Sequence, residues 1–188
     1  MYYFDEKADV VDPLEPYNSV YEPLFGAPVR QDHEYGFSAQ QSAIYGQLEW
    51  RPPIMDDRLT TTVGLRWTKE EKDAYVAHRE VPFFAQSSDE WTDLAPTLIA
   101  SFALTDEVNV YAKYAKGWKA GGFNGESSDP VAFREGYDPQ NVDAYEIGLK
   151  SRLFDDALQF NAALFYNEET DLQLSVFSGG SSASSVVR

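Results

Sequence analysis

Strict alternation between apolar and polar side chains, repeated three times, is the feature that most constrains how this chain folds. In the first instance every second residue from 59 to 67 belongs to one mostly apolar face, made by Leu59, Thr61, Val63, Leu65 and Trp67. A period of two is typical of a β-strand with two unlike faces, whereas a helix would scatter the same residues around its axis. The chain is therefore predicted to be built from two-faced strands.

Three acidic turns divide the alternating segments into hairpins. The first acidic residues of these turns, Asp56, Asp106 and Asp155, recur at nearly equal spacing, and alternating segments run into and out of each turn. This arrangement predicts an all-β fold, an antiparallel up-and-down meander of about six long strands. The predicted hairpins lie near residues 40–70, 91–118 and 141–170. The predicted long polar loops cover residues 8–36, 71–90, 119–140 and 171–188.

The direction of the apolar face decides between two architectures. In a soluble sandwich or barrel this face points inward, whereas in an outer-membrane barrel it meets lipid and the polar face lines a wet lumen. Three features favour the membrane. The apolar faces are long enough for a tilted strand to cross a bilayer, aromatic residues gather where these faces end, and the connections alternate between short and long.

The polar face carries charges that would be costly in lipid. An arginine or lysine at the middle of a bilayer costs about 2–4 kcal/mol, whereas in an aqueous lumen it costs little. We therefore predict five lumen-facing charged residues, which are Glu49, Arg66, Lys113, Glu146 and Lys150.

The amino-acid composition argues against several classes of function. The formal net charge of −16 disfavours binding to nucleic acid, because phosphates bind to clustered positive charge. Cysteine is absent, which excludes disulfides, thiolate metal sites and a cysteine nucleophile. No nucleophile–base arrangement and no histidine-based metal site is visible in the sequence. We therefore predict no catalytic residue, no metal ligand and no cofactor.

Several segments resemble the barrel hairpins of the TonB-dependent outer-membrane receptors. The first is residues 43–50 (AIYGQLEW) followed by 57–72 (DRLTTTVGLRWTKEEK). The second is residues 109–124 (NVYAKYAKGWKAGGFN). The third is residues 145–155 (YEIGLKSRLFD) followed by 158–166 (LQFNAALFY). The resemblance covers residues 37–178 and is specific because three such hairpins occur in the order found in the family.

The resemblance implies a fold and a function for the whole protein. Receptors of this family are plugged outer-membrane barrels of about 22 strands, and they use the TonB complex to import scarce nutrients, most often ferric siderophores. The chain is expected to be a part of such a barrel that carries no signal peptide, TonB box or plug and is too short to close. The implied partners are outer-membrane lipid and lipopolysaccharide, the TonB complex through a segment outside this chain, and an iron chelate.

A glycine-rich segment, residues 116–125, is the candidate ligand-binding region. It lacks the ending and the following helix of a nucleotide-binding loop, so a phosphate site is not expected. The simpler interpretation is a strand that leaves the membrane into a loop whose glycines supply positive φ angles. The resemblance places this region on the outer side of the membrane, where it implies ligand contacts by Trp118, Lys119, Phe123 and Asn124.

The acidic residues of the long connections have two interpretations. Glu70, Glu71 and Asp73 could form a divalent-cation site, or they could belong to a solvated strand extension in which Lys69 and Lys72 are interleaved. The acidic loops as a group could bridge Ca²⁺ or Mg²⁺ to lipopolysaccharide, they could repel anionic solutes, or they could simply keep the loops soluble.

Two alternatives to a transport receptor stay open at this point. One is a soluble all-β module that binds a ligand or carbohydrate on aromatic platforms, and the other is a β-barrel hydrolase. The receptor hypothesis would fail if Leu59, Val63, Leu65 and Leu164 were packed against one another inside a compact monomer.

Overall fold

The computed structural model describes residues 2–14, 31–78, 83–127, 129–178 and 181–187. The described elements are mainly strands, joined by the short 3-10 turn η1 (Met55–Asp57) and the short helix α2 (Pro130–Glu135). The strands are β1 (Tyr2–Leu14), β2 (Gln31–Trp50), β3 (Leu59–His78), β4 (Phe83–Ala103), β5 (Val108–Lys119), β6 (Gln140–Leu153), β7 (Leu158–Thr170), β8 (Leu172–Ser178) and β9 (Ser181–Val187).

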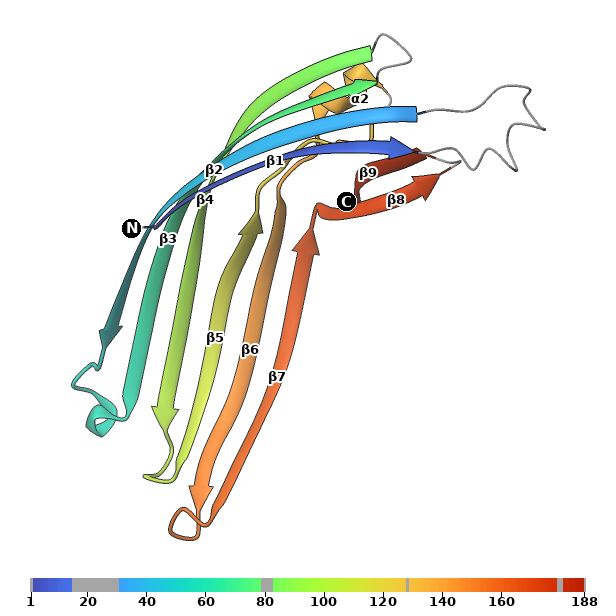
Figure 1. Ribbon diagram of the computed structural model, residues 1–188. Coiled ribbons are helices and arrows are strands. Elements are labelled where there is room, and N and C mark those ends of the chain that lie inside the picture. The colour runs from blue at the N-terminus through green and yellow to red at the C-terminus, as the bar shows by residue number, and fades with distance from the viewer. Residues whose placement is uncertain (1, 15–30, 79–82, 128, 179–180, 188) are drawn as a thin grey trace.

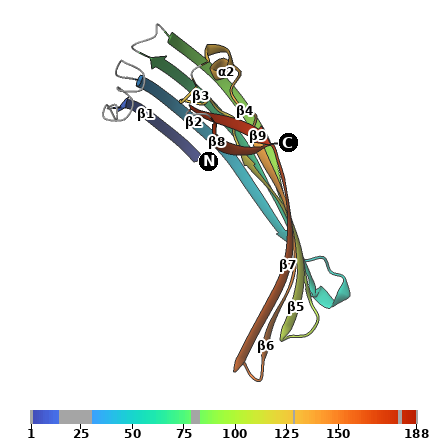
Figure 2. The same ribbon diagram turned by 90° about the vertical axis from the view of Figure 1, so that its right-hand side faces the viewer.

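The strands β1 to β7 form one antiparallel sheet in which neighbours in the chain are neighbours in space. Figure 1 shows this meander, and Figure 2 shows from the side that it is a single thin layer that bends along its length. The strands β8 and β9 form a separate small hairpin. The predicted all-β antiparallel meander is therefore confirmed, with seven strands in the main sheet.

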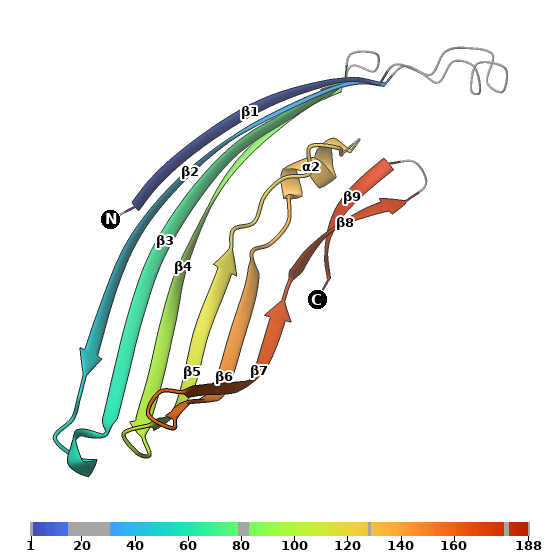
Figure 3. The ribbon, with the colours of Figure 1, turned by 60° about the horizontal axis from the view of Figure 1, so that its bottom comes forward.

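The sheet is curved, and the helix α2 lies on its concave side (Figure 3). Phe133 of α2 packs there against Val76 of β3 and Ala85 of β4, and the three side chains form a buried apolar cluster. Arg66 has the same strand parity as Val76, so the charged face predicted from the sequence is the concave face. The apolar face is therefore convex.

The register joins the predicted apolar faces of six strands into one continuous surface. Val63 lies opposite Leu48 on one side and opposite Leu98 on the other. Farther along the sheet, Tyr145 lies between Tyr114 and Tyr166, with ring centroids at 5.1 and 6.3 Å. Directly opposed residues share a face, so these pairs carry the apolar surface from β2 to β7.

This apolar surface is exposed rather than packed into a core. The exposed fractions are 51% for Val63, 46% for Leu65 and 72% for Leu164. A soluble module would have to bury these side chains, because a contiguous apolar face of this size is costly in water. The exposure therefore favours a membrane wall over the soluble alternative.

The acidic turns close the hairpins at one end of the sheet. Asp56 and Asp57 have φ angles of 54° and 59°, and Asp155 and Asp156 have φ angles of 54° and 67°. Aspartate tolerates this left-handed region better than most residues, because its short polar side chain bonds to nearby backbone. The turn around Asp106, the second along the chain, instead uses Thr105, whose hydroxyl accepts hydrogen bonds from two backbone N–H groups, at 3.0 and 3.2 Å.

The predicted loop boundaries are wrong in two of the long connections. Residues 8–14 and 31–36 belong to β1 and β2, and residues 71–78 and 83–90 belong to β3 and β4. The rest of the first predicted loop, residues 15–30, lies outside the described residues. The ladder continues past the apolar surface, but the two-faced alternation stops in β3 at residues 68–73, where both faces are polar. Ion pairs of Lys69 with Glu71 and Glu90, at 2.5 and 3.0 Å, occupy the outer face of this extension.

The other two predicted loops also contain regular structure. The segment 171–188 holds the hairpin of β8 and β9, and the segment 119–140 holds α2. The helix begins because the Asp129 carboxylate accepts a hydrogen bond from Val131 N, at 2.8 Å, and Pro130 occupies the first turn. It ends at Gly136, whose φ of 63° favours glycine. No helix among the described residues has the length and hydropathy that crossing a membrane requires.

Candidate functional site

The segment between β5 and β6, residues 120–139, folds back over the concave face, and we refer to it as the returning loop. Phe133 anchors it, since this side chain is fully buried against Val76 and Ala85. Phe123 continues the contact, with its ring 5.8 Å from that of Phe133 and 6.2 Å from that of Trp91 on β4. The returning loop is therefore held to the sheet by an aromatic cluster.

A network of polar side chains lies beside this cluster. Glu70 of β3 accepts a hydrogen bond from the Gln41 amide at 2.6 Å and forms an ion pair with Lys72 at 3.0 Å. Lys72 also donates to the carbonyl of Gly121 at 2.8 Å, and its ammonium lies 5.7 Å from the centre of the Trp91 ring. The side chains of Glu70 and Lys72 are mostly buried, at 13% and 22% exposed. Lys72 thus ties the returning loop to the sheet.

A cavity of about 380 Å³ lies between the returning loop and the strands β1 to β3. Its aromatic walls come from segments far apart in the sequence and include Phe4, Tyr35, Phe123, Phe133 and Tyr137. Its polar lining includes Gln41, Glu70 and Lys72. A concave, mainly aromatic space with a few convergent polar groups is typical of a small-molecule site.

The Tyr137 hydroxyl is a hydrogen-bond donor in this cavity at neutral pH. Burial raises the pKa of Tyr137, and the negative charge of Glu70 raises it further. Since the ordinary pKa of tyrosine is already about 10, the phenol stays protonated. The cavity thus combines a neutral hydroxyl with the charged pair of Glu70 and Lys72.

The glycines of the returning loop allow a close approach to the sheet. A Cβ atom on Gly121 would overlap the Tyr137 carbonyl and lie 2.8 Å from the Trp91 ring, and one on Gly125 would lie 2.7 Å from the Tyr35 ring. Among the described glycines a positive φ occurs at Gly136. The expectation that glycines within 116–125 supply positive φ angles is therefore wrong, and their absent side chains are what the packing requires.

This packing gives a testable prediction for Gly121. Replacing Gly121 with alanine is expected to destabilise the closed returning loop by about 1–3 kcal/mol, because the new methyl group meets backbone that cannot move aside. Hydrogen exchange of residues 120–139 measures this change. The matched control is Gly46→Ala, since a Cβ on Gly46 meets nothing within 4 Å. Equal exchange in the two variants would contradict the packing argument.

The four residues expected to contact a ligand in this region lie in different places in the structure. Phe123 lines the cavity. Lys119 ends β5 with an exposed side chain, and strand alternation places it on the concave face with Lys113. Trp118 falls on the convex face with Tyr114, and neither it nor Lys119 lines the cavity. Asn124 accepts a hydrogen bond from Glu126 N at 3.1 Å and so shapes a turn in the returning loop.

The five charged residues predicted to face a lumen share the concave face. Lys113 lies opposite Glu146, and the parity along β2, β3 and β6 places the remaining three on the same side. The Tyr111 hydroxyl donates to Glu146, and the Lys150 ammonium lies 5.2 Å from the centre of the Tyr111 ring. That this face encloses an aqueous lumen stays a prediction.

Strand alternation separates the three carboxylates considered as a cation site. Glu70 faces the cavity beneath the returning loop, whereas Glu71 and Asp73 lie on the convex face. Glu71 is also paired with Lys69. The interpretation as a strand extension therefore describes these residues better than a shared cation site.

Sequence reasoning missed Tyr35, Phe133 and Tyr137 as cavity residues. The Asp129–Pro130 start and the Gly136 end of α2 are a helix signal that could have been found in the predicted loop. Nothing local indicates that Tyr35 and Tyr137 line one cavity, because this depends on how far β2 extends past the apolar surface.

A convex apolar face, a concave charged face and an aromatic cavity at one end define the wall of a transmembrane β-barrel receptor. The family model described as "TonB dependent receptor-like, beta-barrel" matches residues 2–186. The chain therefore belongs to the TonB-dependent receptor family, as a part of its β-barrel. Its location is the outer membrane.

Similar proteins support the assignment to this family. The chain is 28% identical over 140 residues to the pesticin receptors of Yersinia enterocolitica and Yersinia pestis, a match that covers 73% of this chain and 20% of each receptor. The chain thus spans about a fifth of the length of these curated relatives. The family consists of receptors and transporters rather than enzymes.

Two solved structures share the fold. The ferric yersiniabactin uptake receptor FyuA from Yersinia pestis aligns with a TM-score of 0.68 and 24% identity, over 80% of this chain and 23% of that one. The alcaligin outer-membrane receptor FauA from Bordetella pertussis aligns with a TM-score of 0.51 and 15% identity, over 97% of this chain and 32% of that one. Both alignments support the fold of a receptor barrel wall.

Proposed function

We propose that the protein containing this chain imports a ferric siderophore across the outer membrane, with energy supplied through the TonB complex. The observation that carries the proposal is the aromatic cavity of about 380 Å³ on the concave face, at the end of the wall that carries the returning loop. The names of the similar proteins support the choice of ligand, since FyuA is a ferric yersiniabactin uptake receptor and FauA an alcaligin receptor. Outer-membrane lipid and lipopolysaccharide surround the convex face in this proposal.

Within this function, Phe123 and Lys119 are the ligand contacts. Phe123 presents an aromatic ring in the cavity, which suits an aromatic or heterocyclic part of a chelate. Lys119 presents an exposed ammonium on the concave face, which suits anionic oxygen atoms. Trp118 serves instead at the convex surface, where aromatic side chains anchor barrels at the membrane boundary.

Growth on defined iron sources tests the proposal. A strain lacking the full-length gene is expected to lose growth on at least one ferric siderophore under iron limitation and to regain it with the wild-type gene. Phe123→Ala is expected to lower uptake of that radiolabelled ferric siderophore about tenfold, the loss expected for one good aromatic contact. Phe154→Ala is the matched control, because Phe154 is 75% exposed in a turn at the opposite end of the sheet. Undiminished growth of the deletion strain on every ferric siderophore would refute the siderophore assignment.

A further inference from the structure

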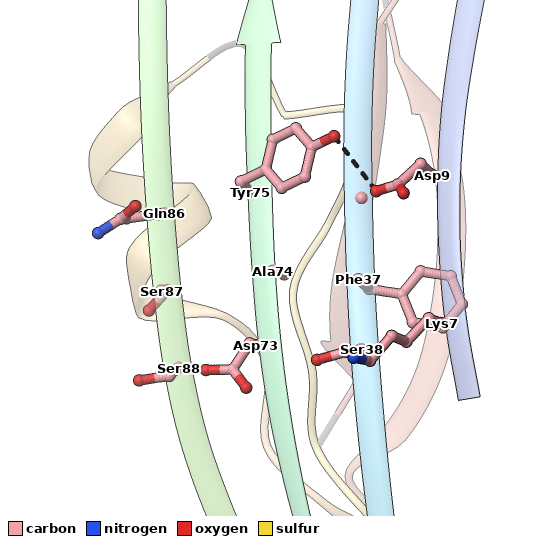
Figure 4. A pocket seen from close by; sticks show the side chains of 11 residues that line it. Lys7, Asp9, Phe37, Ser38, Asp73, Ala74, Tyr75, Gln86, Ser87 and Ser88 are labelled. Carbon is pink, nitrogen blue, oxygen red and sulfur yellow. Dashed lines mark hydrogen bonds between the residues drawn. The ribbon is translucent and has the colours of Figure 1, made fainter. Parts of the chain in front are cut away.

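A second pocket, of about 640 Å³, lies on the convex face beyond the apolar band, and we refer to it as the outer pocket. It is on the opposite side of the sheet from α2 and from the candidate ligand cavity. Figure 4 shows its side chains, which come from four adjacent strands. The transport function proposed above makes no use of it.

The outer pocket is built from two neighbouring rows of directly opposed residues. The first row runs across β1 to β4 through Lys7, Ser38, Asp73 and Ser88. The second row runs across the same strands through Asp9, Gly36, Tyr75 and Gln86. Because opposed residues share a face, the extended register alone brings these side chains together.

Gly36 creates the floor of the outer pocket. A Cβ atom there would overlap the Tyr75 ring and the Asp9 carboxylate, so its absence lets the ring lie across β2. The Tyr75 hydroxyl then donates to Asp9 at 3.3 Å (Figure 4), and Glu34 lies within 3.4 Å of the same oxygen. The ring also stacks on Phe84, at 6.5 Å and 25°, which gives a supported aromatic platform.

Both hydrogen-bond donors and hydrogen-bond acceptors surround the Tyr75 ring. Asp73 offers acceptors, Lys7 offers donors, and Gln86 and Ser88 offer both. Within the described residues, the side chains of Asp73, Gln86 and Ser88 make no hydrogen bond or ion pair with the protein. Burial, and then the charges of Asp9 and Glu34, raise the pKa of Tyr75, so its hydroxyl stays protonated and donates. The pocket is thus able to satisfy a ligand rich in hydroxyl groups.

The charge of the outer pocket selects against anions. Asp9 and Asp73 outnumber Lys7, and Glu34 adds a further negative charge beside Tyr75. A phosphate or carboxylate ligand would be repelled by these carboxylates. A neutral ligand with hydroxyl groups on its edge and C–H groups on its face matches both the hydrogen-bonding groups and the electron-rich face of an aromatic ring.

We propose that the outer pocket binds a neutral saccharide, with a sugar ring stacked on Tyr75 and its hydroxyl groups bonded to Asp73 and Gln86. This site is separate from the proposed uptake site, so either can fail without the other. The sugar has two sources, the neutral part of the lipopolysaccharide that surrounds the barrel or a free saccharide outside the cell. The pocket's place just beyond the apolar band puts it within reach of both.

Saturation-transfer NMR on the full-length receptor in detergent tests this proposal. The probes are a neutral oligosaccharide of the outer core of lipopolysaccharide, which carries neither phosphate nor carboxylate, and the disaccharide maltose. Saturation is expected on the ring protons of the core oligosaccharide, and transfer to maltose, with it or alone, would assign the site to free saccharides. No transfer to either probe would overturn the proposal.

Variants at the pocket decide whether the signal belongs to it. Asp73→Ala and Gln86→Ala are each expected to weaken saccharide binding about tenfold, the effect of one lost hydrogen-bonding group, while siderophore uptake stays at the wild-type level. Both side chains are exposed, so neither change affects packing. Asp106→Ala, in a turn at the other end of the sheet, is the matched control and is expected to bind as the wild type. Binding that is unchanged in both pocket variants would overturn the proposal.

Discussion

Replacing Val63 with arginine is expected to lower the free energy of unfolding of the full-length receptor in lipid vesicles by about 2–4 kcal/mol. Val63 lies near the middle of the convex apolar face, opposite Leu48 and Leu98, and is 51% exposed. A guanidinium at this position would meet lipid on all sides, where it has no partner for its charge. Urea unfolding followed by tryptophan fluorescence, with the heat-dependent gel mobility of the barrel as a second readout, measures the loss.

The neighbouring residue provides the control for this experiment. Thr62→Arg places the same side chain, with the same change in charge, on the concave face, where Glu49 lies directly opposite. Its free energy of unfolding is expected to stay within about 0.5 kcal/mol of the wild type, as for a solvated surface substitution. Equal destabilisation by the two variants would show that the two faces are not divided between lipid and water.

Phe133→Ala is expected to destabilise the closed returning loop by about 3–5 kcal/mol. The Phe133 ring is fully buried between the returning loop and the concave face, so its removal leaves a cavity beside Val76 and Ala85. Limited proteolysis of the full-length receptor is expected to cut the variant within residues 120–139 while the wild type resists. Siderophore binding is expected to weaken with the same variant, because Phe133 also lines the candidate cavity.

A control variant on the same helix distinguishes the loss of Phe133 packing from an effect on helix formation. Val131→Ala changes a side chain that is 59% exposed, and alanine is a good helix former, so this variant is expected to resist proteolysis as the wild type does. If both variants were cut at the same rate, the anchoring role of Phe133 would be wrong.

The strands within the membrane could be predicted from the sequence because each has two unlike surroundings. Leu59 to Trp67 alternate in polarity, since one side meets lipid and the other meets the concave face, and the register then aligns Val63 with Leu98 as the pattern indicates. The acidic turns could also be predicted from the sequence, because Asp56 and Asp155 adopt the left-handed backbone conformation that aspartate tolerates.

The rest of the wall and most of the candidate cavity could not be predicted, for a physical reason. From Thr68 to Asp73 both faces of β3 are polar, so these residues show no alternation even though the backbone ladder continues through them. The cavity then depends on this hidden extension, because it brings Tyr35 and Glu70 under the returning loop. Among the side chains that line the cavity, Phe123 was the one expected from the sequence to contact a ligand.

The row of tyrosines on the convex face, together with the turns at the opposite end, fixes how thick a bilayer the wall fits. The apolar run from Leu59 to Trp67 rises about 3.3 Å per residue, and with a strand tilt of about 40° it covers roughly 20 Å of bilayer depth. The bacterial outer membrane is thinner than an average bilayer. A thicker membrane would have to thin around the protein or bury Tyr114, Tyr145 and Tyr166 in its apolar interior. The height of the apolar face therefore makes the protein most stable in a thin membrane.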